Sequence, residues 1–104
     1  MVHVSGKDLR EELDRTETDS VRVFDTGAMT VGLKRYSEET AKEKGKRTHS
    51  EDELYYILSG AGEIRVGKET HSVATGDLLY IDPGKSHDIL DVDEELTVLK
   101  IFAR

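Results

Sequence analysis

The chain has 104 residues, of which 22 are acidic and 15 basic, for a formal net charge of −7 at pH 7. This charge argues against nucleic acid or an anionic membrane as the main partner, because both would repel the chain. The absence of cysteine excludes disulfides and thiolate chemistry, and no apolar run approaches the roughly 20 residues of a transmembrane helix. We therefore expect one domain over residues 1–104, with a cytoplasmic location by default.

The first periodic segment predicts a short amphipathic helix over about residues 6–14. Ser5 can cap its start, Asp8 lies in its first turn, and Leu9 and Leu13 share one face. From about residue 20 the helical period gives way to the alternation of β-strands. This change predicts that the remainder of the chain, about residues 20–103, forms a β-domain.

Short alternating runs separated by Gly, Asp or Pro turns fill most of that domain. The expected strands are VRVF (21–24), AMTVGLKRY (28–36), ELYYILSG (53–60), GEIRVG (62–67), two around the turn at 75–77, one near 87–91, and, after an acidic turn, one near 96–102. Such spacing is typical of an antiparallel sandwich or barrel. The charged segment SEETAKEKGK (37–46) lacks the alternation and is interpreted as a loop.

A histidine and a glutamate lie four residues apart in front of the strand at 53–60. In an extended chain His49 and Glu53 point to the same side, together with Tyr55. Both faces of this strand are apolar, so the alternation alone does not say which side encloses Glu53. His87 follows a Pro-Gly turn and would complete a set of two histidines and one carboxylate, which suits Fe, Mn, Ni, Zn or Cu. The alternative is that all three are surface polar residues.

The spacing of these residues resembles the two motifs of the cupin superfamily, which are small jelly-roll β-barrels. The first motif is G-x5-H-x-H-x3–4-E-x6-G and the second is G-x5-P-x-G-x2-H-x3-N. The matching residues are His49, Glu53 and Gly60 in the first motif, and Gly76, Gly84 and His87 in the second. The resemblance implies an all-β, antiparallel jelly-roll barrel with a short N-terminal helix, and a divalent transition metal bound by His49, Glu53 and His87.

Three departures from the motifs bear on the metal. Arg47 stands at the leading histidine, Ala41 at the leading glycine, and Asp91 at the usual asparagine. A guanidinium has no lone pair for a metal, but pointing inward it would attract a carboxylate or phosphate substrate. Pointing outward it would pair with Glu51 or Asp52, and we favour this outward orientation because the preceding segment is full of solvated charges.

Two further residues are candidates for the cavity wall. His71 shares the parity of Val73 and could approach the site, although such a histidine more often lies on the surface. Tyr55 could line the cavity, although packing in the core is the simpler role. No catalytic residue is assigned from the sequence.

The resemblance leaves the activity open, because cupins include dioxygenases, isomerases, decarboxylases and ligand-sensing domains. The first hypothesis is a metalloenzyme, such as a dioxygenase, acting on a small oxygen-rich molecule. The second is a non-catalytic module that binds a small ligand, and the third is a metal-free, isomerase-like enzyme with a histidine base. The chain is most similar to stand-alone, single-domain cupins, which implies a homodimer that removes an open sheet edge, with the N-terminal strand or the helix near Leu9 and Leu13 as the contact.

Overall fold

The computed structural model describes residues 3–15 and 19–104. The helices there are α1 (Gly6–Arg15) and α2 (Glu38–Lys44), and the strands are β1 (Ser20–Asp25), β2 (Met29–Tyr36), β3 (Arg47–Thr48), β4 (Asp52–Val66), β5 (Glu69–Ala74), β6 (Leu78–Ile81) and β7 (Ser86–Ala103). α1 agrees with the helix predicted over 6–14. Within the described residues, neither helix has the length and apolar character needed to span a membrane.

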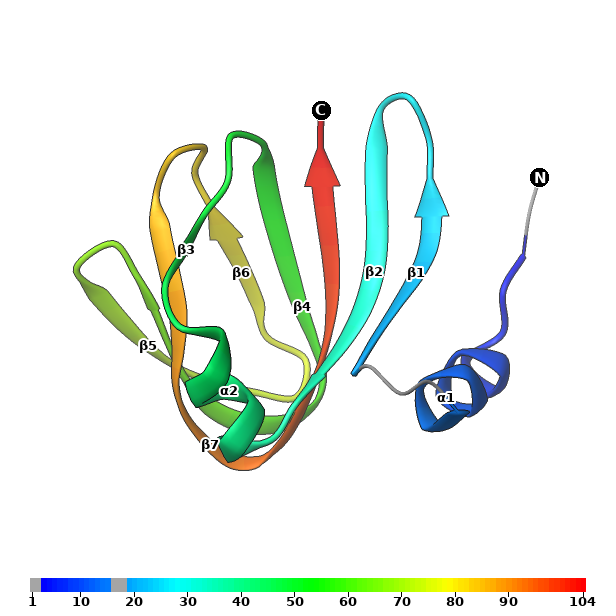
Figure 1. Ribbon diagram of the computed structural model, residues 1–104, viewed down its shortest axis with the longest axis horizontal. Helices are drawn as coiled ribbons and strands as arrows, with labels where there is room; N and C mark the ends of the chain where they lie inside the picture. Colours follow the sequence, from blue (N-terminus) through cyan, green and yellow to red (C-terminus); the bar gives the residue numbers. More distant parts are fainter. Residues whose placement is uncertain (1–2, 16–18) are drawn as a thin grey trace.

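Two long antiparallel strands, β4 and β7, run through both layers of the fold. The first half of β4 and the second half of β7 pair with each other and continue through β6 on one side and β2 and β1 on the other. The second half of β4 and the first half of β7 continue through β5 and β3. Figure 1 shows both long strands bending where they pass from one layer to the other. The antiparallel jelly roll is therefore confirmed, although the strand path β1-β2-β7-β4-β5 does not close into a complete barrel within the described residues.

The two strands predicted at 53–60 and 62–67 form one continuous strand, β4, which bends between them. Gly60 adopts a positive φ of 99°, and a Cβ placed there would lie 2.1 Å from the backbone oxygen of Glu95. Glycine is therefore required at this close approach of β4 to β7. The prediction of an acidic turn after residue 91 is also wrong, because these residues continue β7 and pair with β4 through shifts of register. Both β4 and β7 remain continuous through their bends, because each pairs with other strands in the second layer.

The predicted loop at 37–46 contains helix α2. Ser37 caps the helix, because its side chain accepts a hydrogen bond from the backbone N–H of Thr40 while the Thr40 hydroxyl accepts one from the Ser37 N–H. Ala41 is 3% exposed and packs into the core. A helix of this length buries a single small apolar residue, so its sequence carries almost no periodic signal.

The core lies between the two layers and fixes which face of β4 is internal. Tyr55 and Ile57 are buried, whereas Tyr56 and Leu58 are partly exposed on the opposite face. The core residues are Tyr36, Ala41, Tyr55, Ile57, Ile64, Val66, Val73, Ile81, Val92, Leu96 and Val98. Full burial of each large side chain contributes about 1.5–3 kcal/mol. Because Glu53 shares the parity of Tyr55, its side chain is directed into this inner face.

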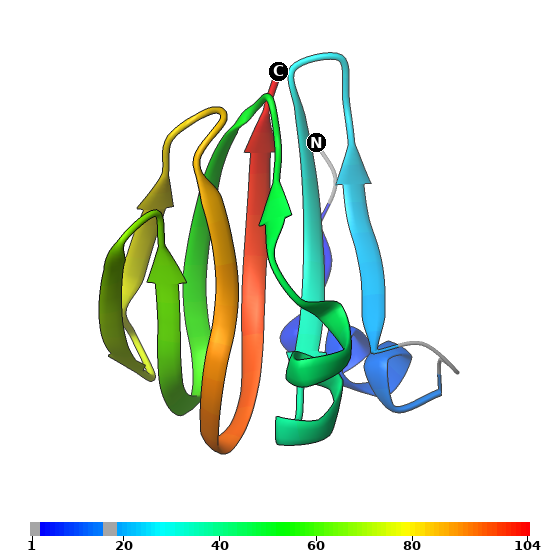
Figure 2. The same cartoon turned by 60° about the vertical axis from the view of Figure 1, so that its left-hand side comes forward.

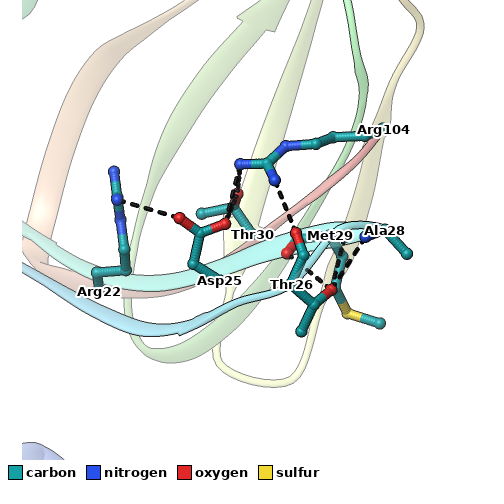
Figure 3. A network of polar contacts seen from close by, with 7 residues as sticks. All are labelled: Arg22, Asp25, Thr26, Ala28, Met29, Thr30 and Arg104. Atoms are coloured by element: carbon teal, nitrogen blue, oxygen red, sulfur yellow. Dashed lines mark hydrogen bonds and ion pairs between the residues drawn. The ribbon is translucent and has the colours of Figure 1, made fainter.

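The β1–β2 hairpin forms one wall of the inner face and is anchored by the C-terminal residue. Arg104 donates from Nη2 to Asp25 Oδ1 at 3.0 Å and to Thr30 Oγ1 at 2.7 Å, and from Nη1 to the Thr26 carbonyl oxygen at 2.7 Å (Figure 3). On the outer side, α1 lies against β1 and β2 (Figure 2) and buries Leu13. The hairpin is therefore held from both sides.

Candidate metal centre

Three side chains from separate segments meet on the inner face of the sheet. Glu53 extends from β4, His87 from β7, and His49 from the segment that follows β3. One ligand atom from each residue lies within 4.8 Å of the others. His49 Nε2 is 3.6 Å from Glu53 Oε1, and His87 Nε2 is 3.3 Å from Glu53 Oε2. The structure thus brings together the two histidines and the carboxylate that the sequence analysis selected.

Backbone hydrogen bonds join the two motifs that supply these side chains. β3 pairs with the start of β7, so that Arg47 lies opposite His87. The N–H of Gly84, in the Pro-Gly turn, donates to the carbonyl oxygen of His49 at 2.7 Å. Gly84 has a φ of 79°, which a glycine adopts without strain. The turn therefore holds the entry of β7, and with it His87, beside the segment that carries His49.

The polar atoms of the centre fit a metal ion. Glu53 is 1% exposed and His87 is 4% exposed, yet neither Glu53 oxygen and neither His87 ring nitrogen has a hydrogen-bond partner among the described residues. Leaving a buried polar group unsatisfied costs about 1–3 kcal/mol. A cation at the point where these atoms converge would satisfy the carboxylate and one nitrogen of each imidazole. His49 is more exposed, so the centre is accessible from its side.

The surroundings favour the form of His87 that can bind a metal. Burial lowers the pKa of the His87 imidazole, the Glu53 carboxylate partly opposes this effect, and the ammonium of Lys100 strengthens it. A neutral imidazole keeps the lone pair that a metal requires, whereas a protonated one does not. Burial therefore favours the neutral form of the His87 imidazole, which is the form that a metal requires.

Aromatic side chains enclose the centre. Tyr55 is 1% exposed and its ring lies edge-on to His87 with the centroids 5.9 Å apart. Phe102 packs against His49 at 5.2 Å between centroids. Tyr55 therefore packs in the core beside the centre, and its burial also raises the pKa of its phenol.

Lys100 was missed by the sequence analysis. It is 8% exposed, donates to the hydroxyl of Tyr36, and its Nζ lies 4.8 Å from the ring centroid of Tyr55. The signal was a lysine within the apolar run TVLKIFA, at the same parity as Val98. Lysine is almost never fully buried unless it is paired, so a lysine at this position indicates a polar partner inside the sheet.

The structure chooses between the alternatives that the sequence left open for two further residues. Arg47 is directed toward the inner face and lines the cavities beside Tyr55 and Lys100, instead of pointing outward to Glu51 or Asp52. Its register explains this, because strand residues directly opposite each other share a face, and its partner is the buried His87. His71 lies on β5 opposite Ile64 with its Nε2 3.4 Å from Glu69 Oε2, and it is not part of the three-residue centre.

The fold and this centre define a jelly-roll domain with a candidate site of two histidines and one carboxylate. Comparison with known families gives a match to the cupin domain over residues 36–102. This match includes all three candidate ligands and more than half of the chain, so the chain belongs to the cupin family.

Individual relatives agree with this assignment. An uncharacterized protein of Streptomyces coelicolor is 36% identical over 75 residues, which cover 72% of this chain and 70% of that protein. A cupin protein from Bacteroides fragilis has a TM-score of 0.66 and 24% identity, covering 86% of this chain and 79% of that one. A conserved protein of unknown function from Streptococcus pyogenes has a TM-score of 0.69 and 19% identity, covering 100% of this chain and 90% of that one. At these identities the two solved structures are evidence for the fold alone.

Proposed function

We propose that the chain binds one divalent transition-metal ion through His49, Glu53 and His87, and that the centre receives a small oxygen-rich ligand. The observation that carries this proposal is the convergence of the three side chains within 4.8 Å, while the buried Glu53 oxygens have no hydrogen-bond partner in the described part of the chain. Two imidazoles and one carboxylate form a ligand set that Fe, Mn, Ni, Zn and Cu accept. The three protein ligands also leave coordination positions for an exogenous group.

Each residue has a separate part in this function. A bound metal would supply Lewis acidity or, if it is redox-active, activation of oxygen. Glu53 lowers the positive charge of the loaded centre, while the exposed side of His49 provides the approach for a ligand. Tyr55 and Phe102 pack against the imidazoles and limit their rotation, which keeps the nitrogens directed toward one point. The same walls exclude water from the buried side of the centre.

Metal binding can be tested directly on untagged protein. We expect elemental analysis and calorimetric titration to give close to one metal ion per chain. The variants His49→Ala, Glu53→Gln and His87→Ala should each lose this stoichiometric binding. His71→Ala is the matched control, because it removes an imidazole outside the centre and should bind metal as the wild type does. Equal metal content in all of these proteins would contradict the proposed ligands.

Metal binding is common to two possible functions, a metalloenzyme such as a dioxygenase and a non-catalytic ligand-binding module. They differ in whether a bound small molecule is converted. Incubation of the metal-loaded protein with small diketones under oxygen, followed by mass spectrometry, separates the two functions. Turnover that disappears in Glu53→Gln supports the enzyme, whereas binding without turnover supports the module. Turnover that persists in metal-stripped protein would instead support the isomerase-like alternative.

We also propose that the chain forms a homodimer. Jelly-roll sheets expose edge strands, and pairing with a second copy removes such an edge from solvent. Helix α1 offers less apolar surface to a second copy than the sequence predicted, because Leu13 is buried within its own chain. Light scattering should give twice the chain mass of 11.7 kDa, and a particle of one chain mass at micromolar concentration would refute the dimer.

A further inference from the structure

The side of the sheet opposite the metal centre carries a band of apolar side chains. Two neighbouring rows cross β2, β7, β4 and β6, one formed by Leu33, Leu99, Tyr56 and Leu78 and the other by Val31, Ile101, Leu54 and Tyr80. Because opposite residues share a face, both rows lie on one side of the sheet, with Leu58 beside them. Neither row contains a charged residue. We call this surface the outer face.

The outer face is exposed where β4 and β6 form it. Six large hydrophobic side chains are exposed among the described residues, and four of them belong to the outer face, namely Tyr56, Leu58, Leu78 and Tyr80. The most exposed are Leu78 at 65% and Tyr80 at 53%. A sheet face in contact with water normally carries polar residues, and a contiguous apolar patch marks an interaction site. The outer face therefore has the composition of a surface that a partner covers.

Helix α1 covers only one side of the outer face. It packs against β1 and β2, where Leu13 and Leu33 are buried. Figure 1 shows α1 on the β1 side of this sheet and β6 on the opposite side. Between the helix and β7 lies a groove of about 540 Å³, whose wall includes Leu9, Leu58 and Leu99. We call it the α1 groove.

The two sides of the outer face complement each other in shape. Leu78 and Tyr80 project from β6 at one border, and the α1 groove is hollowed at the other. Tyr80 is held in this position because its hydroxyl donates to Asp52. A two-fold axis along the strands, between β7 and β4, places β6 of each copy over the α1 groove of the other. The outer face is therefore self-complementary.

The charges of the chain favour the same partner. Two chains of net charge −7 repel each other, so they approach at the lowest cost through a surface whose rows carry no charge. At the α1 groove, Arg35 already forms ion pairs with Asp14 at 3.0 Å and with Glu95 at 3.4 Å. This guanidinium therefore requires no charged group from outside the chain.

The area of the outer face is sufficient for a dimer. Four strands about 4.8 Å apart, each with about eight residues of about 3.3 Å, cover about 500 Å². Two such faces packed together remove about 1,000 Å² from water, which reaches the lower limit for a specific interface. The walls of the α1 groove add to this area.

We infer that a second copy of the chain covers the outer face, with β6 of each copy seated over the α1 groove of the other. This inference rests on the proposed homodimer and names the surface through which it forms. The outer face ends at β6, an edge strand that pairs only with β4 within the described residues. The dimer therefore shields this edge, and it leaves the metal centre free on the inner face.

Sedimentation equilibrium of full-length variants over a range of concentrations tests the outer face. Leu78→Lys on β6 and Leu58→Lys in the α1 groove replace side chains that are exposed in the single chain, so the core is not disturbed. The two-fold axis places each new charge in the interface twice. The dissociation constant of the dimer should therefore rise by at least about 100-fold in either variant.

Leu90→Lys is the matched control. It makes the same substitution at an exposed leucine in the first half of β7, which belongs to the second layer. It should dimerise as the wild type does. Lysine lowers the net negative charge of the chain, so general repulsion does not explain a loss of the dimer. Close to one metal ion per chain in all three variants would show that their folds are intact.

Hydrogen exchange of the wild type at high and low concentration tests the same surface without a substitution. Peptides from β6 should exchange more slowly in the concentrated sample, because the second copy covers this edge strand. Peptides from β5 lie outside the outer face and should exchange equally in both samples.

The outcomes separate this inference from the proposed homodimer. A wild-type dimer that persists in both outer-face variants, or that is lost equally in Leu90→Lys, overturns the inference and leaves the homodimer standing. Exchange in β6 that does not change on dimerisation has the same consequence. A wild type that is monomeric at every concentration refutes the homodimer and this interface together, and leaves the outer face to a different protein.

Discussion

Replacing Glu53 with glutamine is expected to separate the metal-binding role of this side chain from any role in stability. Glu53 is the only carboxylate of the three-residue centre, and its two oxygens accept no hydrogen bond among the described residues. The amide of glutamine has nearly the same shape but binds metals poorly. The variant should therefore lose metal affinity while the metal-free fold is preserved.

The size of the effect follows from linkage between binding and folding. Metal at about 100 times its dissociation constant stabilises the wild type by about 2.7 kcal/mol. For a domain of this size each kcal/mol raises the midpoint of thermal unfolding by about 4–8 °C, so metal should raise it by about 10–20 °C. Loss of supporting groups around a metal ligand already costs about 10–100-fold in affinity. With a 100-fold loss, the same metal concentration should raise the midpoint of Glu53→Gln by only about 2–3 °C.

Thermal unfolding followed by circular dichroism, with and without metal, measures the metal-dependent rise of the midpoint in the wild type and in Glu53→Gln. Glu63→Gln is the matched control on the same strand, because Glu63 lies between the buried Gly62 and Ile64 on the opposite face. It should show the full metal-dependent rise. A rise of equal size in Glu53→Gln would refute the assignment of Glu53 as a ligand. A metal-free variant that unfolds far below the metal-free wild type would show instead that the carboxylate is structural.

Three further predictions follow from particular contacts. Gly60→Ala should lower the free energy of unfolding by roughly 2–4 kcal/mol, because the new methyl group would meet the backbone oxygen of Glu95. Urea titration measures this loss, and an unchanged unfolding midpoint would contradict the close approach of the two strands. A hydrogen bond to Asp52 raises the pKa of Tyr80 to about 12, so Asp52→Ala should return one phenol toward about 10 in ultraviolet titration, whereas an unaltered titration curve would exclude the contact. Burial lowers the pKa of His87, so the metal-free fold binds this proton less readily than the unfolded chain, and stability should decline as pH falls below about 6.5. In urea titrations His87→Gln should show a shallower decline, and an identical pH dependence would be evidence against this linkage.

The three candidate metal ligands could be selected from the sequence because their signal is local. The four-residue distance from His49 to Glu53 and the Pro-Gly turn before His87 are both short spacings that can be read directly from the sequence. The orientation of Arg47 was predicted wrongly because its neighbours in the sequence are solvated charges. Its neighbour across the sheet is His87, and that pairing is absent from any local window of the sequence.

Helix α2 and the continuity of the long strands were missed for a related reason. Ala41 is a single small residue in a charged segment, and its burial depends on the core that the two layers create. The acidic residues after position 91 resemble a turn in composition, but they remain extended because β4 pairs with them through the bend. Tertiary pairing overrides local composition at both places.

The sequence by itself determined the antiparallel β-class, the N-terminal helix and the identity of the three candidate ligands. These features depend on alternation, capping and short spacings, which are properties of neighbouring residues. Only the tertiary structure decided which face of β4 is internal and that Lys100 and Arg47 share a cavity beside His49. Those relations arise from the register between strands far apart in the chain, because register alone sets which side chains meet across a sheet.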